Sequence, residues 1–340
     1  MKTERLELNT ALYNESISRA AQILKNDGIV GIPTETVYGL AASAYSVKAI
    51  AKVFEAKGRP QDNPLIVHIS DLDMITDITD SFDEKAKKCA EAFWPGPFTM
   101  VLKRFDKIPS EVSAGLDTVA VRMPDSKVAR DVINKAGLPL AAPSANISGS
   151  PSPTSAYHVL ADLDGKIDGI LMGENSGVGV ESTVVSLCMD PPRLLRPGGI
   201  TVEQLKTVLP DIVIDKAVLS EVEQGQKVSS PGMKYKHYAP KTDTVLVCGN
   251  TDKFADFVNS KKDSLAICFN EDIDKINIKK ICYGNMADES SLAHNLFSVL
   301  READEKGVKT VYIHAPSKQG VGLAVYNRLI RAAAYKVIEL

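Results

Sequence analysis

Apolar residues recur along the chain with two spacings, one typical of helices and one typical of strands. In residues 15–27, Ile17 and Leu24 lie on one face of a helix, and Gly28 can end it. The apolar run I-V-G-I comes next and predicts a short buried strand. Ser46 is a suitable N-cap for a second helix, whose pattern stops at the turn around Gly58, and Thr201 with Gln204 forms a capping box for a later helix. The same spacings predict helices at 83–93, 126–136 and 154–162, and strands at 64–69, 98–103, 118–122, 138–142, 182–187 and 193–196.

The pattern changes twice along the chain and predicts three parts. Residues 1–209 alternate strands with helices and form a mixed α/β domain. In residues 210–243 the apolar periodicity fades, which predicts a segment between domains. Residues 244–340 alternate again, with strands at T-V-L-V-C, S-L-A-I-C-F, K-I-C-Y and V-K-T-V-Y-I-H and helices at 252–262, 291–306 and 322–337. Such alternation predicts a small parallel sheet with helices on its faces.

The segment between the domains contains the stretch V-S-S-P-G-M-K-Y-K-H-Y-A-P-K. Flexible linkers are rich in small polar residues, whereas this stretch has two tyrosines, one histidine and three lysines. Tyrosine in a loop favours packing against another surface. We therefore expect the stretch to lie over part of the folded protein.

Composition and charge exclude some partners. The 340 residues are 44% hydrophobic and 24% charged, as in ordinary globular proteins, and the net charge is −3. Proteins that bind long nucleic acids usually carry a large basic excess, so a polyanion bound here would be small. The absence of a signal core and of a long apolar run predicts a cytoplasmic protein without membrane contact. The five cysteines show no C-x-x-C spacing, which predicts buried reduced thiols.

Basic residues stand beside glycine, proline and the ends of strands. Lys57 and Arg59 flank a glycine just before the run P-L-I-V-H-I. Arg122 ends the apolar run V-A-V-R, and Arg196 lies in L-L-R-P-G-G. A buried arginine is costly unless it is paired, and for any single arginine a structural ion pair is the simpler explanation. Several such cations together favour one anionic ligand, because guanidinium donates two parallel hydrogen bonds to phosphate or carboxylate.

Hydroxyl-bearing residues gather in three segments near strand ends. These are P-T-E-T-V-Y-G-L (33–40), A-A-P-S-A-N-I-S-G-S-P-S-P-T (141–154) and V-E-S-T-V-V (180–185). One such cluster usually forms turns and helix caps, whereas three predict a polar pocket. The chain has no G-x-x-x-x-G-K-[ST] loop, no G-x-G-x-x-G after its first strand and no G-x-S-x-G elbow. A phosphate site would therefore have to be built from these segments and the cations.

One histidine and three acids near the motifs have simple structural explanations. His68 lies inside an apolar strand, where histidine is most often a satisfied core residue. Its strand face is not purely hydrophobic, which slightly favours a pocket wall; a serine hydrolase would need it as the base. Glu35, Asp62 and Glu181 are predicted to be surface or capping acids and not Mg²⁺ ligands.

Eight motifs that occur in order resemble one known family. They are P-T-E-T-V-Y-G-L, K-G-R-P-x-x-N-P-L, W-P-G-P-F-T, V-A-V-R-M-P, A-P-S-A-N-x-S-G, E-S-T-V-V, R-P-G-G-I-T and S-P-G-M-K-Y-K-H-Y-A-P. Nearly the whole chain is similar to the L-threonylcarbamoyladenylate synthases in their two-domain form. The resemblance implies a YrdC-like α/β catalytic domain over residues 1–209, with a twisted mixed sheet and flanking helices. It further implies a lid loop at 210–243 and a small Rossmann-like parallel α/β domain at 244–340.

The resemblance implies a nucleotidyl transfer. L-threonine, bicarbonate and ATP would give threonylcarbamoyl-AMP and pyrophosphate, with Mg²⁺ accompanying ATP. Downstream proteins of the tRNA modification pathway would then move the threonylcarbamoyl group to tRNA. Contact between this chain and tRNA stays open.

The resemblance also implies roles for particular residues. Lys57 and Arg59 would be catalytic, in a K-x-R…S-x-N set that Ser144 and Asn146 complete at the nucleotide. Further ATP contacts are implied at Asn63, Thr118, Ser152 and Arg196, with Tyr235 and His237 reaching the site from the lid. Threonine contacts are implied at Thr36, His68, Arg122, the backbone of Ala142, and Ser182.

Two other functions use the same residues differently. The cations could line a concave surface of a non-catalytic RNA-binding module, although the net acidity and the lack of a basic stripe count against it. An ordinary carboxylate-activating ligase would also bind ATP beside an amino acid. Only a threonylcarbamoyl-AMP synthase needs bicarbonate and threonine together.

Overall fold

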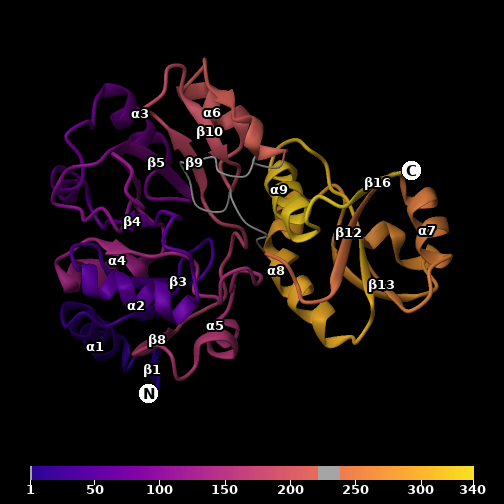
Figure 1. Ribbon diagram of the computed structural model, residues 1–340, viewed down its shortest axis with the longest axis horizontal. Coiled ribbons are helices and arrows are strands. Elements are labelled where there is room, and N and C mark those ends of the chain that lie inside the picture. Colours follow the sequence, from indigo (N-terminus) through magenta and orange to yellow (C-terminus); the bar gives the residue numbers. More distant parts are fainter. Residues whose placement is uncertain (1, 221–237) are drawn as a thin grey trace.

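The computed structural model describes residues 2–220 and 238–340, which build two sheets flanked by helices (Figure 1). The larger sheet has the strand order β1 (Glu4–Glu7), β8 (Gly169–Met172), β2 (Val30–Ile32), β3 (Gly39–Ser43), β7 (Leu140–Ala141), β4 (Ile66–His68), β6 (Thr118–Arg122), β5 (Phe98–Lys103), β9 (Thr183–Ser186), β10 (Arg193–Arg196) and β11 (Val213–Ile214). Neighbouring strands pair in both directions: β1 and β8 are parallel, whereas β2 and β3 are antiparallel. The first domain is therefore built on a mixed sheet, as predicted.

The smaller sheet is entirely parallel. Its order is β14 (Lys279–Gly284), β13 (Ser264–Phe269), β15 (Thr310–His314), β12 (Asp243–Cys248) and β16 (Val337–Glu339). The helices α7 (Thr251–Asn259), α8 (Glu289–Glu305) and α9 (Gly322–Ala332) and the 3₁₀ turn η3 (Asn270–Lys275) connect its strands. A mixed sheet followed by a small parallel sheet confirms the predicted fold class.

Helices cover both faces of the larger sheet. They are α1 (Tyr13–Lys25), α2 (Val47–Lys57), α3 (Glu84–Phe93), α4 (Lys127–Ala136), α5 (Ala156–Leu163) and α6 (Val202–Val208), with 3₁₀ turns η1 (Leu72–Asp77) and η2 (Lys216–Val218). Alternate residues of β3 point to opposite faces, as strand geometry requires. Ala41 packs in a cluster with α1 and α4, whereas Leu40 and Ala42 pack in a cluster with α2 and α5. The sheet is thus buried between two helical layers.

Caps begin and end the helices where the sequence predicts them. Ser46 accepts the backbone N–H of Ala49 at the start of α2, and Thr201 and Gln204 form the predicted capping box of α6. Gly58 follows α2 with a φ of 58°, in the left-handed region that glycine adopts without strain. The helix therefore stops at Lys57, and the chain turns sharply toward β4.

Some predicted boundaries were wrong. The last helix was predicted to reach residue 337, but α9 ends at Ala332, and Ala334 and Tyr335 have φ values of 48° and 61°. This turn sends the chain into β16, which the pattern did not predict, and which pairs with β12. Strand β3 was also not predicted, because its sequence G-L-A-A-S is fully buried and shows no alternation.

The second domain docks on the first through α8 and α9 (Figure 1). Val37 and Val180 of the first domain belong to the same apolar cluster as Phe297 and Tyr326 of those helices. Gly179 has a φ of 82°, and a Cβ added there would overlap the backbone of α8. Gly179 thus lies at a close contact between the domains.

The helices and the cysteines bear on two further expectations from the sequence. Among the described residues, no helix combines the length and the apolar character that crossing a membrane requires. All five cysteines are free thiols. The prediction that they are buried was only partly right, because Cys89 and Cys268 are buried whereas Cys188 is exposed.

Candidate active site

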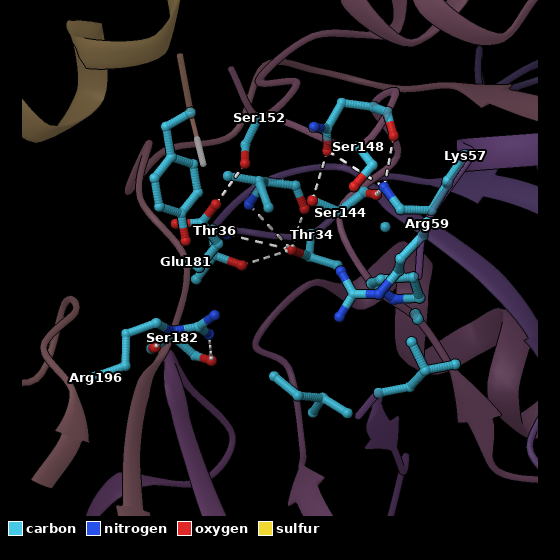
Figure 2. Close-up of a pocket in the computed structure, with 18 of the residues that line it drawn as sticks. Thr34, Thr36, Lys57, Arg59, Ser144, Ser148, Ser152, Glu181, Ser182 and Arg196 are labelled. Carbon is cyan, nitrogen blue, oxygen red and sulfur yellow. Dashed lines mark hydrogen bonds between the residues drawn. The ribbon is translucent and has the colours of Figure 1, made fainter. Parts of the chain in front are cut away.

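One pocket of the first domain collects most of the predicted site residues. It runs along β4, between the end of α2, the segment after β7, and the ends of β6 and β10. Figure 2 shows Lys57 and Arg59 on one side of the pocket and Arg196 and Ser182 on the other. The predicted ATP contacts that line it are Lys57, Arg59, Ser144, Asn146, Ser152 and Arg196. The predicted threonine contacts that line it are Thr36, His68, Arg122, Ala142 and Ser182.

Lys57 is buried at the end of α2 and is held by neutral acceptors. Its Nζ donates to the backbone oxygens of Ser144 and Asn146, each at 2.5 Å. Burial, together with the nearby charge of Arg59, lowers the pKa of Lys57 well below its usual value. An anion in the pocket would act in the opposite direction and favour the charged amine.

Arg59 fixes the turn that enters β4. Its Nη2 donates to the backbone oxygens of Asn63 at 3.2 Å and Pro64 at 3.1 Å. Its Nε is buried and has no hydrogen-bond partner among the described residues. Burial lowers the pKa of Arg59 to about 10, so the group stays charged at neutral pH. A buried charged donor with an open N–H is costly, and a ligand oxygen would remove that cost.

Arg122 is already paired, as the simpler explanation for a single buried arginine predicts. Its Nη2 lies 2.5 Å from Oε1 of Glu35, its Nη1 donates to the hydroxyl of Thr36 at 2.9 Å, and its Nε donates to the backbone oxygen of Gly96 at 3.2 Å. These contacts use three of the five N–H groups of the guanidinium. Arg122 is thus fixed by an ion pair and still has N–H groups to offer a carboxylate.

The hydroxyl of Thr36 is oriented by its neighbours. Thr34 donates its hydroxyl proton to the backbone oxygen of Val37 at 2.6 Å, so it can only accept from Thr36, whose Oγ1 lies 2.8 Å away. The same Oγ1 of Thr36 accepts from Arg122. The Thr36 hydroxyl therefore donates to Thr34 and accepts from Arg122, and these two hydrogen bonds set its orientation before any ligand binds.

Ser144 and Asn146 form a closed turn after β7. The hydroxyl of Ser144 donates to Oδ1 of Asn146 at 2.6 Å. The amide Nδ2 of Asn146 donates to the backbone oxygens of Ile147 at 2.9 Å and Ser150 at 2.8 Å. The backbone N–H of Ser148 also donates to the carbonyl of Lys57 at 2.8 Å. The turn and the end of α2 are therefore fixed to each other.

Arg196 and Ser182 form the opposite wall (Figure 2). Nε of Arg196 donates to the backbone oxygen of Ser182 at 3.1 Å, and its Nη2 donates to the Ser182 hydroxyl at 3.2 Å. That hydroxyl is also 2.8 Å from the hydroxyl of Thr99 on β5. Burial lowers the pKa of Arg196. The arrangement places a guanidinium and two hydroxyls across the pocket from Lys57.

His68 is a poor candidate for a base. Burial and the charge of Arg122 lower its pKa to about 3, so the ring is neutral at physiological pH. Its Nδ1 lies 3.1 Å from the backbone oxygen of Ile66. A group this acidic takes up protons weakly at neutral pH, which disfavours the serine-hydrolase alternative. His68 instead forms part of the pocket wall.

Two of the three acids near the motifs are not on the surface. Asp62 is exposed, as predicted, but Glu35 is largely covered and paired with Arg122, and Glu181 is buried. Glu181 lines the pocket, accepts a hydrogen bond from Ser152 and pairs with Arg328 of α9 at 3.0 Å. The sequence did not predict these pairs, because the partners are separated by 87 and 147 residues.

Two of the remaining predicted contacts, Asn63 and Thr118, are not among the residues that line the pocket. Asn63 is buried beside the pocket, and its Oδ1 has no hydrogen-bond partner among the described residues. Thr118 stands at the start of β6, outside the residues that line the pocket. Tyr235 and His237 lie outside the described residues. Tyr238, which follows them, is buried, lines the pocket and stacks near Phe297 of α8, with ring centroids 5.4 Å apart.

The described part of the chain shows no cluster of three or more metal-ligating side chains. Glu181, which lines the pocket, and Glu35, which pairs with the pocket residue Arg122, are both engaged by arginines. Magnesium usually binds protein through one or two carboxylates together with substrate phosphates. The geometry therefore fits an ion that arrives with a nucleotide better than a resident metal.

Comparisons with known proteins match both domains. Residues 22–198 match the family model Sua5_yciO_yrdC, described as "Telomere recombination", and residues 200–334 match the model Sua5_C, described as "Threonylcarbamoyl-AMP synthase, C-terminal domain". Relatives named threonylcarbamoyl-AMP synthase include one from Bacillus subtilis (strain 168), 43% identical over 100% of both chains. Another, from Pyrococcus abyssi (strain GE5 / Orsay), is 42% identical over 94% of this chain and 95% of the relative. A crystal structure of P. abyssi Sua5 complexed with L-threonine superposes with a TM-score of 0.90 at 38% identity and covers 100% of each chain. The pocket and these matches together identify the chain as a member of the Sua5/YciO/YrdC family in its two-domain form.

Proposed function

We propose that this protein is a threonylcarbamoyl-AMP synthase, which makes threonylcarbamoyl-AMP and pyrophosphate from L-threonine, bicarbonate and ATP. The convergence of Lys57, Arg59, Arg122 and Arg196 on one hydroxyl-rich pocket carries the proposal. Full-length relatives that bear this name support it, as does the threonine-bound relative of the same fold. The non-catalytic RNA-binding alternative is disfavoured, because the cations lie inside a pocket and not along an exposed face.

The chemistry needs little from the protein beyond position and charge. The threonine amine combines with bicarbonate to give a carbamate and water. A carbamate oxygen then attacks the α-phosphorus of ATP, and the bond to pyrophosphate breaks. Transfers of this kind depend on alignment and on neutralising the phosphate charge. No protein nucleophile is required, which agrees with the neutral His68.

Each wall of the pocket has a proposed task. Lys57 and Arg59 neutralise the phosphates from one side, and Arg196 does so from the other (Figure 2). Arg122 offers its remaining N–H groups to the threonine carboxylate, and Thr36 and Ser182 offer hydroxyls to the amino acid. Asn63 contributes its open amide oxygen next to the turn at Arg59. These assignments combine the pocket geometry with the family motifs, and they are proposals.

The proposal extends to the reaction class, the division of the chain and the location of the protein. We assign the reaction to the nucleotidyltransferases, with magnesium bound to ATP as part of the substrate. We divide the chain into a catalytic domain (1–209), a lid segment (210–243) and a second α/β domain (244–340), although β11 extends the sheet of the first domain to residue 214. We place the protein in the cytoplasm, where its product would pass to proteins that modify tRNA.

Pyrophosphate release tests the function directly. The protein is mixed with Mg–ATP, and threonine and bicarbonate are added separately and together in degassed buffer. We expect rapid release only when both are present, and threonylcarbamoyl-AMP in the product by mass spectrometry. Release without bicarbonate would identify an ordinary ligase instead. Salt-dependent tRNA binding without any release would identify an RNA-binding module.

A matched lysine pair controls the assay. Lys57 and Lys87 are both helical lysines, but Lys87 lies on α3 in an exposed ion pair with Glu84. We expect Lys57→Met to abolish most of the release and Lys87→Met to leave it unchanged. Equal losses in the two variants would show that the pocket is not the site of reaction.

A further inference from the structure

Arg328 is a fully buried arginine of the second domain that reaches into the first. Three contacts cross the interface: its Nε pairs with Oε2 of Glu181 at 3.0 Å, its Nη1 donates to the backbone oxygen of Pro197 at 2.6 Å, and its Nη2 donates to the backbone oxygen of Glu181 at 3.2 Å. A fourth contact, to Oδ1 of Asn327, stays within α9. The guanidinium is thus fixed by partners on two segments of the first domain.

These two segments carry the wall of the pocket that faces Lys57. One contains Glu181 and Ser182, and the other places Pro197 directly after Arg196. They are packed so closely that a Cβ added at Gly198 would overlap the backbone of residues 181–183. By holding both segments at once, Arg328 fixes the position of the Arg196 guanidinium relative to the Ser182 hydroxyl.

Glu181 joins Arg328 to the interior of the pocket. One oxygen of its carboxylate pairs with Arg328, and the other accepts the hydroxyl proton of Ser152, which lines the pocket. Burial would raise the pKa of Glu181, but the charges of Arg328 and Arg196 hold it below the usual value. The carboxylate therefore stays ionised, and it needs a cation if it is not to repel an anionic ligand.

Stability alone is a weak reason for such a pair. A buried ion pair often contributes no more to folding than well-packed apolar residues of similar volume. Its distinctive effect is to fix geometry and charge, because losing either partner leaves the other uncompensated. A pair that has one member in the pocket and the other in a different domain connects the two.

We propose that Arg328 is a positioning residue for nucleotide binding, through which the second domain neutralises Glu181 and holds the Arg196 wall of the pocket in place. The inference rests on the proposed function, because it takes ATP as the ligand. Arg328 touches no reacting atom. It acts through Glu181, Ser152 and the backbone at Pro197.

Steady-state kinetics of the full-length protein test the proposal, with Mg–ATP varied at saturating threonine and bicarbonate. In Arg328→Met we expect the KM for ATP to rise about tenfold, with a smaller change in kcat and in the KM for threonine. Arg328→Lys keeps the charge but loses the multiple contacts, so its KM for ATP should lie between those of the original protein and Arg328→Met. Circular dichroism and thermal unfolding show whether each variant is folded.

A second interdomain arginine provides a control that faces no pocket carboxylate, although its Nη2 also donates to the backbone oxygen of Pro151, between the pocket-lining Ser150 and Ser152. Arg301 of α8 pairs with Asp162 of α5, with Nη1 and Nη2 at 3.0 Å and 2.9 Å from the carboxylate oxygens. Asp162 does not line the pocket. We expect Arg301→Met to lose a similar interdomain ion pair while changing the KM for ATP less than about threefold.

If Arg328 compensates the charge of Glu181, its loss should make the KM for ATP depend on pH, which a purely structural role would not. Glu181 is faced by Arg328, by Arg196 on β10, by Lys57 on α2 and by Tyr238. In Arg328→Met the carboxylate is less compensated, so the KM for ATP should rise further as pH increases and Glu181 ionises. Adding Glu181→Gln should return the KM to within a few-fold of the original protein and remove that pH dependence.

The outcomes separate this inference from the proposed function. If the original protein releases no pyrophosphate from ATP with threonine and bicarbonate, the proposed function fails, and the kinetic arms have no basis. If it does, and Arg328→Met matches Arg301→Met, only the role of Arg328 is overturned. Absence of rescue by Glu181→Gln would likewise overturn it. If Arg328→Met does not fold, the KM for ATP is compared between Arg328→Lys and the double variant Glu181→Gln/Arg328→Gln. A KM raised in the first and close to that of the original protein in the second supports the role of Arg328, and any other result overturns it.

Discussion

In the first domain, Lys57 is buried and Arg59 half-buried against carbonyl groups, whereas in the second domain His314 is buried against a carboxylate. Nδ1 of His314 lies 2.7 Å from Asp272 and Nε2 lies 2.9 Å from the backbone oxygen of Gly249. Both partners offer oxygen acceptors, and each ring nitrogen lies within hydrogen-bond distance of one of them. The ring also stacks on Phe254, with centroids 4.3 Å apart.

The contrast shows how a buried group that serves the fold differs from one that is open to a ligand. Both ring nitrogens of His314 have partners inside the fold without any ligand. Arg59 has an open Nε, and Lys57 has only neutral acceptors at hydrogen-bond distance. A protein that leaves buried cations without close counter-ions gives up stability, and such sites are typical of ligand pockets.

Replacing His314 should have the largest effect, and it should be on stability. In His314→Leu, the buried carboxylate of Asp272 loses its imidazole partner, so we expect the free energy of unfolding to fall by about 3–5 kcal/mol in urea titrations. Pyrophosphate release by the folded fraction should be nearly unchanged. The pKa of Asp272 is lowered in the fold, so this stabilisation is present at neutral pH and is lost as pH falls toward that lowered pKa. A loss of stability below about 1 kcal/mol, or a strong loss of activity, would contradict a purely structural role of His314.

Replacing Arg59 should have the opposite profile. We expect Arg59→Met to reduce kcat/KM for ATP by about 10²–10³, the effect of removing one preorganised charged donor. Arg104 is a suitable control, because it also donates to backbone oxygens, those of Leu116 and Ile108, and does not line the pocket. Arg104→Met should reduce the melting temperature more than the activity. Similar kinetics for the two variants would contradict the distinction.

Replacing Thr36 should weaken the binding of threonine and leave the binding of ATP nearly unchanged. Thr36→Val removes the hydroxyl that Arg122 and Thr34 orient, so we expect the KM for threonine to rise about 10–100-fold. The KM for ATP, measured in the same variant, serves as the internal control and should change little. A parallel rise in both constants would show that the substitution disturbs the whole pocket.

Proton uptake on ATP binding should be the smallest effect. The pKa of Lys57 is lowered in the free protein, and the phosphates would raise it, so binding takes up protons at pH values between the two pKa values. ATP affinity should therefore decline as pH rises through the lower value. Calorimetry in buffers of different ionisation enthalpy measures the uptake, and Lys57→Arg, which stays charged, should eliminate it. Uptake that persists in this variant would assign the proton to another group.

Local signals in the sequence predicted much of the fold. The stop at Gly58, the caps at Ser46 and Thr201 and the alternation after residue 243 all depend on near neighbours, and the structure confirms them. Strand β3 and the turn after α9 depend on what packs around them, so the pattern missed the first and extended the helix through the second.

Motifs in the sequence predicted candidate site residues, because Lys57, Arg59, Arg122 and Arg196 stand in motifs whose glycines and prolines set the local turns, and the structure brings these four to one pocket. Which of their charges are paired became clear only from the folded structure. Glu35 meets Arg122 across 87 residues, and Glu181 meets Arg328 across 147 residues and a domain boundary. Ion pairing depends on distance in space, which the order of residues along the chain does not fix.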